Sequence, residues 1–252
     1  MVCYSRLRPL IPKSIKLIVL KSIDSTNNYA MKLVKKGCES DAVIIAYEQS
    51  KGKGTRGRSF FSPNGKGLYI SLLLHIKRGI DVFHPPTPAV AVAVKRAIVS
   101  HYGLKPKIKW VNDILLDNRK LCGVLVETTL KEREDVVLII GVGINIISGS
   151  LPVELKGKTA ALDEFTNIGR IEEFAGLLFD EIFRLLTSSV PDDYMEEYKR
   201  DSTVLGRDIR FTVKGKSING KARDITDKGH LVVDTCDGEV TLLSGDVSII
   251  SV

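Results

Sequence analysis

The polar chemistry of this chain is concentrated in one glycine-rich basic stretch, residues 49–63. Glycine tolerates positive φ and lets a ligand approach the backbone closely, and successive N–H groups in such a loop form an anion-binding concavity. The pattern predicts a loop for a carboxylate or phosphate, although a solvated basic turn fits it equally well. It is not a Walker A loop, since no Gly-Lys-Ser/Thr precedes a helix. The alternating residues are Lys51, Gly52, Lys53, Gly54, Thr55, Arg56, Gly57 and Arg58.

A second polar cluster is Ser25, Thr26 and Asn27, directly before residues with helical spacing that end at Gly37. The free amides and the positive dipole end of a helix N-terminus favour an anion. Asp24 or Ser25 can also cap such a helix, and Gly37 is a suitable residue to close it. The cluster is therefore consistent both with a ligand site and with plain capping.

The net charge of +7, from 37 Lys and Arg against 30 Asp and Glu, suits an anionic ligand, an acidic protein partner or nucleic acid. The basic residues are dispersed outside the loop, and no helix-turn-helix pattern or long basic tail is present. We therefore expect no DNA binding. A non-enzymatic nucleic-acid-binding module stays as a separate hypothesis, although the chain lacks aromatic residues interleaved on a basic strand.

The four cysteines, Cys3, Cys38, Cys122 and Cys236, are far apart, which excludes a zinc motif and a disulfide framework. The histidines are scattered, so we expect no histidine base and no metal site made by the protein. No apolar run approaches the ~18 residues of a membrane span, and no signal peptide is recognisable. We expect a reduced, cytoplasmic protein without membrane contact.

These residues are positioned by an expected α+β domain, a mixed or antiparallel sheet flanked by helices. Hairpin-sized intervals favour a four-strand antiparallel core, and turn signals about every 10 residues after Gly206 indicate a small all-β domain. We place the domains at 1–202 and 203–252. The expected strands are 15–20, 42–47, 67–75, 107–116 (interrupted at Asn112-Asp113), 120–127 and 136–146, and the expected helices are 25–36, 87–103, 171–186 and 192–199.

Five stretches in this order resemble the biotin protein ligases. Their sequences are Asp-Ser-Thr-Asn at 24–27, Gly-Lys-Gly-Thr-Arg-Gly-Arg at 52–58, Lys-Trp-Val-Asn-Asp at 109–113, Arg-Lys-Leu-Cys-Gly at 119–123 and Gly-Val-Gly-Ile-Asn at 141–145. The resemblance covers residues 15–252, because the family also carries a small SH3-like C-terminal domain. It implies that biotin and ATP with Mg²⁺ form biotinyl-5′-AMP, and that a lysine of a biotin carboxyl carrier domain then takes the biotinyl group.

The resemblance also implies roles for individual residues. Lys120, Asp113 and Lys53 match catalytic positions, with Lys120 at the biotin carboxylate and α-phosphate and Asp113 associated with the acceptor lysine or the metal. The implied biotin-binding residues are Ser25, Thr26, Asn27, Gln49, Lys53, Gly54, Thr55, Lys120 and Gly123. The implied adenylate-binding residues are Gly52, Lys53, Gly54, Arg56, Gly57, Arg58, Trp110, Asn112 and Asn145, although a core role for Trp110 is the stronger of its two interpretations.

Thr55 departs from the family pattern, which has arginine there, so a guanidinium donor to the adenylate is lost. Arg56 can compensate, or the intermediate is held less firmly. The chain has no room before residue 15 for the winged helix of family members that repress transcription, so we expect no repressor activity. The alternative activity is that of a lipoate ligase or a lipoyl/octanoyl transferase of the same fold. A homodimer is possible, and the acceptor protein is not specified by the sequence.

Overall fold

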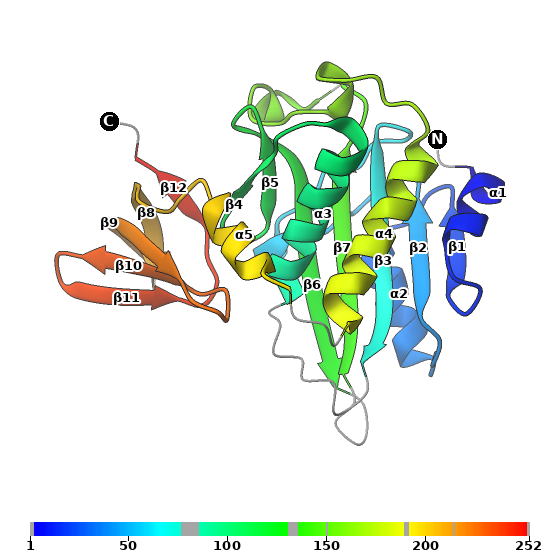
Figure 1. Cartoon of the computed structure of the whole chain (residues 1–252), viewed down its shortest axis with the longest axis horizontal. Helices are drawn as coiled ribbons and strands as arrows, with labels where there is room; N and C mark the ends of the chain where they lie inside the picture. Colours follow the sequence, from blue (N-terminus) through cyan, green and yellow to red (C-terminus); the bar gives the residue numbers. More distant parts are fainter. Residues whose placement is uncertain are drawn as a thin grey trace.

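The computed structural model describes residues 3–76, 86–130, 136–149, 151–188, 192–213 and 215–250. Within these residues, seven strands form one sheet in the order β1-β2-β3-β7-β6-β5-β4 (Figure 1). The bounds are β1 (Lys16–Leu20), β2 (Ala42–Ala46), β3 (Gly67–Ile76), β4 (Lys107–Lys109), β5 (Asp113–Leu116), β6 (Arg119–Leu130) and β7 (Val136–Asn145).

The expected antiparallel core is confirmed, since β3, β7, β6 and β5 pair antiparallel in succession. The stretch 107–116, expected as one interrupted strand, is instead two strands, β4 and β5, which pair antiparallel with each other. The hairpin between β5 and β6 turns at Asp117 and Asn118, which have φ of 51° and 55° as a tight two-residue turn requires. The sheet also extends beyond this core. β2 pairs antiparallel with β3, and β1 pairs parallel with β2, so the sheet is mixed.

The parallel pair is connected by helix α2 (Thr26–Lys35), which covers one face of the sheet. Its buried Ala30 packs there with Ile44, Leu73 and Ile139. Gly37, two residues beyond the last residue of the helix, closes it as expected and has φ of 79°. The N–H of Gly37 donates to Val34 and the next N–H to Leu33, at 2.9 and 3.0 Å, so the last carbonyls are satisfied.

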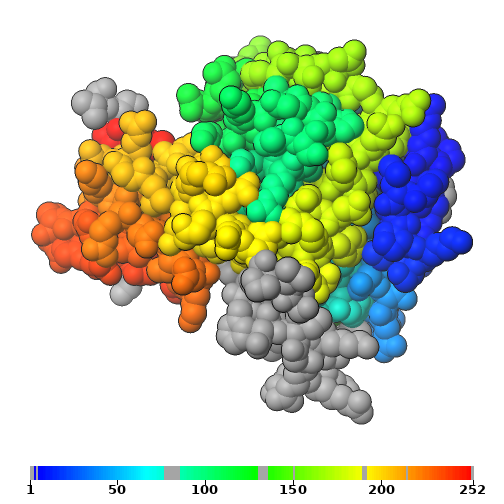
Figure 2. All heavy atoms as spheres, in the orientation of Figure 1, coloured from blue at the N-terminus to red at the C-terminus, as the bar shows by residue number. Residues whose placement is uncertain are grey.

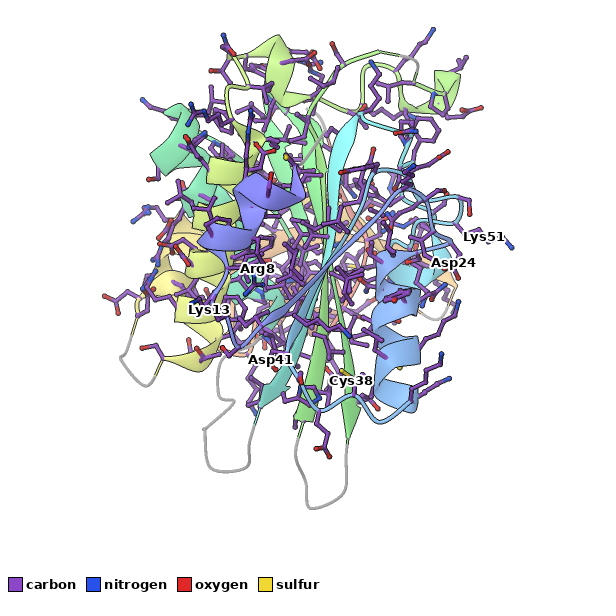
Figure 3. All side chains as sticks on the ribbon, turned by 90° about the vertical axis from the view of Figure 1, so that its right-hand side faces the viewer. Arg8, Lys13, Asp24, Cys38, Asp41 and Lys51 are labelled. Carbon is purple, nitrogen blue, oxygen red and sulfur yellow. The ribbon has the colours of Figure 1, made fainter. Side chains whose placement is uncertain are left out.

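Helices α3 (Pro86–Tyr102) and α4 (Ile171–Thr187) cover the opposite face, together with the short α1 (Tyr4–Leu7). Figure 3 shows α2 and α4 on the two sides of the sheet. The expected apolar face of α4 is buried, with Phe174, Leu178 and Ile182 each 0% exposed. No helix in the described ranges is both long and apolar enough to cross a membrane.

A buried ionic network joins α3, α4 and the short helix α5 (Tyr194–Arg200). Arg96 donates to both carboxylate oxygens of Asp192 at 2.9 and 3.0 Å and to Glu197 at 2.8 Å. Lys95 lies 2.7 Å from Glu197 and also contacts Asp201. The paired cations lower the pKa values of all three carboxyl groups, that of Asp192 to about 2.

The C-terminal part forms a separate five-stranded antiparallel sheet within the described residues, in the order β11-β10-β9-β8-β12. It lies beyond α5, at the end of the molecule where the sheet of the first part ends with β4 (Figure 1). Figure 2 shows its orange and red atoms at the left-hand end, beside the yellow atoms that precede them in the sequence. We propose the domain boundary at residues 202/203, between α5 and β8. The bounds are β8 (Asp208–Val213), β9 (Lys216–Ile225), β10 (Leu231–Thr235), β11 (Gly238–Leu242) and β12 (Val247–Ile249).

Candidate active site

A cavity of about 220 Å³ opens between the N-terminal end of α2, strands β6 and β7, and the basic loop. It is lined by every residue that the sequence suggested for biotin, although these come from three separate stretches of the chain. Apolar side chains of Phe60, Ile70, Val124, Leu125, Val142 and Leu155 complete its wall. The residues from the predicted biotin set are Ser25, Thr26, Asn27, Gln49, Lys53, Gly54, Thr55, Lys120 and Gly123.

The first amide of α2 is capped from the loop and not by a neighbouring side chain. Gln49 Oε1 accepts from the backbone N–H of Thr26 at 2.8 Å and from its hydroxyl at 3.0 Å. Ser25 occupies the N-cap position, yet its side chain makes no capping hydrogen bond. Plain capping by Ser25 is therefore the wrong interpretation of this cluster. The Ser25 hydroxyl lines the cavity instead.

A buried polar network lies beneath the cavity floor. Ser71 of β3 is 0% exposed, and its Oγ lies 2.5 Å from Asn27 Oδ1 and 2.8 Å from Thr26 Oγ1. Gln49 Nε2 donates to Ser62 Oγ at 2.9 Å, which fixes the Gln49 amide so that its oxygen faces Thr26. Such a satisfied network orders the side chains that a ligand would meet.

Three strand glycines permit the close packing of this region. A Cβ at Gly141 would lie 2.5 Å from Asn27 Oδ1, and a Cβ at Gly143 would lie 2.6 Å from the Phe60 ring. A Cβ at Gly123 would be 3.2 Å from Lys120 Nζ. The sequence allowed ordinary packing or close approach for these glycines, and the structure shows close approach of functional side chains to the sheet.

The basic loop forms a narrow hairpin over the cavity. Gln49 N–H donates to the Ser62 carbonyl at 3.0 Å, and Phe60 N–H donates to the Gly52 carbonyl at 2.8 Å. At its tip Arg56 has φ of 57° and Gly57 φ of 74°, the left-handed region in which glycine is unstrained. Lys51 at the loop base donates its N–H to the Asp24 carbonyl at 2.8 Å, and its side chain extends into solvent (Figure 3).

The predicted catalytic lysines are each held by a carboxylate. Lys120 Nζ lies 2.7 Å from Asp113 Oδ1, because the antiparallel pairing of β5 and β6 brings the two residues together. The backbone of Lys120 is fixed from the other side, where its N–H donates to Lys158 and its carbonyl accepts from Ala160, both at 2.9 Å. Lys53 Nζ lies 3.2 Å from Glu127 Oε1.

The residues suggested for the adenylate divide into three groups. Asn112 lines the cavity with Lys53, Gly54 and Arg58, and its amide donates to the Val124 carbonyl at 2.7 Å. Gly52, Arg56 and Gly57 line an open groove on the outer side of the loop. Asn145 lines a separate adjacent pocket, where its amide donates to the Ala160 carbonyl at 3.0 Å.

Trp110 lies apart from the cavity, against the C-terminal part of the chain. It is 3% exposed, its indole N–H donates to the Gly229 carbonyl at 2.9 Å, and its ring lies beside Gly245. Stacking on adenine is therefore the wrong role for Trp110. An apolar ring with one N–H donor serves here to join the catalytic part to the C-terminal sheet.

Three contacts to this region were missed by the sequence interpretation. Ser71 was only a polar residue in an apolar strand, a signal that indicates a buried partner. Glu127 and Asp246 gave no signal in the sequence, since each is a single carboxylate that belongs to no recognisable motif. Asp246 belongs to the C-terminal sheet region, and its Oδ2 accepts from Arg58 Nη1 of the loop at 2.8 Å.

Cys122 is 0% exposed, and burial raises the pKa of its thiol. A thiolate is the nucleophilic form of cysteine, so this environment does not suit the cysteine chemistry expected of an acyltransferase. Within the described residues, no group of three or more His, Cys, Asp or Glu side chains could hold a metal ion.

Comparison with known families now decides the classification. Residues 19–145 match the model of the biotin/lipoate A/B protein ligase family, and residues 204–249 match that of the biotin protein ligase C-terminal domain. The chain belongs to the biotin/lipoate A/B protein ligase family. The match to the second model agrees with the small all-β domain expected from the sequence.

Similar proteins include the bifunctional ligase/repressor BirA of Escherichia coli, 29% identical over 243 residues that cover 92% of this chain and 73% of that protein. The biotin–[acetyl-CoA-carboxylase] ligase of Paracoccus denitrificans is 31% identical over 64% of this chain and 68% of its own length. Among solved structures, biotin protein ligase from Aquifex aeolicus in complex with biotin and ATP has a TM-score of 0.75 and 26% identity, covering 94% of this chain and 99% of that one.

Proposed function

We propose that this family member is an ATP-dependent biotin protein ligase. The observation that carries the proposal is the cavity, which brings together all the residues suggested for biotin from separate parts of the sequence. Two comparisons support it. The chain is similar to biotin ligases along most of its length, and it shares its fold with a ligase that was solved with biotin and ATP. The lipoate alternative has less support, because the named relatives are biotin ligases.

In the first step, an oxygen of the biotin carboxylate attacks the α-phosphorus of ATP, and pyrophosphate leaves. The two reacting groups are both anions, and their repulsion at 4 Å is about 4 kcal/mol at an effective dielectric of ~20. Lys120 offsets this repulsion with a fixed positive charge beside the cavity, and Asp113 orients its ammonium group. Lys53 and Arg58 add cationic donors from the loop.

In the second step, the amine of an acceptor lysine attacks the acyl carbon of biotinyl-5′-AMP, and AMP leaves with the bonding electrons. The loop hairpin lies over the cavity and limits the access of water to the mixed anhydride. We propose a lysine of a biotin carboxyl carrier domain as the acceptor. A cytoplasmic location and a homodimer remain parts of this proposal.

Mg²⁺ is proposed to arrive with ATP. The described residues contain no three-ligand cluster, and magnesium in such enzymes is held largely by phosphate oxygens and water. The two carboxylates nearest the catalytic lysines, Asp113 and Glu127, are paired with Lys120 and Lys53. These pairs favour a role in placing cations over a role as a metal cage.

Biotin-dependent exchange of labelled pyrophosphate into ATP tests the first step without any acceptor. We expect exchange with biotin and none with lipoate. Exchange with lipoate alone would assign the chain to lipoate ligation, and absence of exchange with both acids would contradict an adenylating enzyme.

A further inference from the structure

Glu127 of β6 joins two parts of the site, since it contacts Asn27 as well as Lys53. Its Oε2 accepts from Asn27 Nδ2 at 2.8 Å, and its Oε1 lies 3.2 Å from Lys53 Nζ. The side chain is 28% exposed. A carboxylate on a sheet strand is therefore in contact with both the N-terminus of α2 and the basic loop that bears Lys53.

We propose that Glu127 is a positioning residue. By orienting the Asn27 amide, it determines which polar groups of the pocket donate and which accept hydrogen bonds where the biotin ring would bind. The proposal rests on the proposed function, since it concerns how the same cavity selects its ligand. It adds a residue that acts through another side chain and is not itself among those that line the cavity.

The first step of the argument is the orientation of Asn27. An ionised carboxylate only accepts hydrogen bonds, whereas a side-chain amide has one donating and one accepting end. Glu127 therefore holds the Nδ2 end of Asn27, and the Oδ1 end faces Ser71 Oγ at 2.5 Å. Asn27 is 3% exposed, so an inverted amide would place its oxygen against the Glu127 carboxylate with little water to separate the two.

The second step is the direction of the hydroxyl groups. Ser71 carries one proton and lies within hydrogen-bond distance of both Asn27 Oδ1 and Thr26 Oγ1. A carbonyl oxygen cannot donate, so the Ser71 proton is needed for Asn27. The Thr26 hydroxyl proton is then directed to the other oxygens around it, including Gln49 Oε1 at 3.0 Å.

The consequence is that the Thr26 hydroxyl oxygen, whose proton goes to Gln49, keeps a lone pair that can accept from a donor in the cavity. A cyclic urea, which carries two ring N–H donors, fits such a surface. A dithiolane ring has no N–H group and gains nothing from it, and each unmatched polar group would lose its hydrogen bond to water. Glu127 thereby favours the urea ring of biotin over the ring of lipoate.

The contact with Lys53 is a second, separable effect. Lys53 is 40% exposed at its side chain, and an exposed ion pair of this kind contributes little energy. If Glu127 acted only through Lys53, its removal would change the loop and the binding of ATP. If it acts through Asn27, its removal changes the binding of the biotin ring. The two routes are therefore distinguishable.

The test is a double-mutant cycle on biotin binding, measured by calorimetry in the absence of ATP with the full chain. Glu127→Ala is expected to weaken biotin binding about tenfold, the scale of a hydrogen bond to a charged group. In the Asn27→Ala background, Glu127→Ala should weaken binding less than twofold, because its target is absent. In the Lys53→Ala background it should keep the full effect. Circular dichroism verifies that each variant is folded.

Additive losses in the Glu127 and Asn27 pair would overturn the proposal, as would wild-type affinity in Glu127→Ala. Glu127→Gln is the conservative variant, since its amide oxygen can still accept from Asn27, and we expect it to restore most of the affinity. Failure of Glu127→Gln to exceed Glu127→Ala would also contradict the argument. Wild-type protein that binds no biotin would instead contradict the proposed function, so the two failures are distinct. Glu173→Ala, an exposed glutamate of α4, controls for the loss of one negative charge.

Discussion

Gly141→Ala is the change whose effect follows most directly from the geometry of the pocket. The added Cβ would lie 2.5 Å from Asn27 Oδ1, 3.0 Å from its Cγ and 3.1 Å from its Nδ2. Relief requires Asn27 to move by several tenths of an ångström. Asn27 is 3% exposed and bonded at both ends, to Ser71 and Glu127, so it cannot move without loss of a hydrogen bond.

Overpacking of this kind costs about 1–3 kcal/mol. The ligand-free chain relieves it by displacing Asn27, so the same cost opposes the return of Asn27 to the position in which it would meet biotin. Since each 1.4 kcal/mol is a factor of ten, we expect biotin affinity to fall by about 5-fold to 150-fold, with ATP affinity within twofold of wild type. Isothermal titration of each substrate measures both. Gly176→Ala is the matched control, because the same methyl group is added on α4, where it would meet the flexible Leu10 at 3.1 Å. Unchanged biotin affinity in Gly141→Ala would refute the assignment of Asn27 to the biotin pocket.

Three further changes test other parts of the site and the fold. Lys120→Ala should abolish biotin-dependent pyrophosphate exchange with an unchanged circular dichroism spectrum, and full exchange would remove Lys120 from its role. Thr55→Arg supplies the guanidinium donor usual in the family and should slow dissociation of biotinyl-5′-AMP by several fold in a filter assay; an unchanged rate would mean that Thr55 does not limit retention. Asp192 has a pKa of about 2 in the folded chain, below its unfolded value of about 3.9, so its pair with Arg96 stabilises the fold above pH 4 and the contribution is lost as pH falls toward 2. Asp192→Asn should therefore lower the free energy of unfolding, measured with urea at pH 7, by about 2 kcal/mol at most, with a difference that disappears near pH 2. An equal difference at both values of pH would contradict this linkage.

Periodicity predicted the elements that are set by burial alone. The apolar face of α4 has a single favourable orientation against a core, so sequence and structure agree there. The alternation in β3 predicted a strand buried on one face, but β3 is buried on both, with Leu72 in the main core and Leu73 on the side of α2. The parallel pairing of β1 with β2 was not specified by such patterns, because a strand's hydrophobicity does not determine which neighbour it joins. The helix between the two strands provides the crossover that makes parallel pairing possible.

The site was predicted where a motif combined several residues, as in Ser25 to Asn27 and the glycine-rich loop. It was missed where one side chain acts from a distant strand. Glu127 is 100 positions from Asn27, and Asp246 is 188 positions from Arg58. Only the strand order brings these carboxylates to their partners. The Lys-Trp-Val-Asn-Asp motif suggested Trp110 for the adenylate, with a core role as the stronger interpretation. Its indole is buried and donates to the Gly229 carbonyl, which agrees with the core role.

The measurement that tests the central claim most directly is the intact mass of a biotin carrier domain after incubation with the purified chain and MgATP. We predict a mass increase of one biotinyl group that requires both biotin and ATP and that disappears when the acceptor lysine is replaced. A mass increase with lipoate on a lipoyl domain, or none with either acid, would contradict the account.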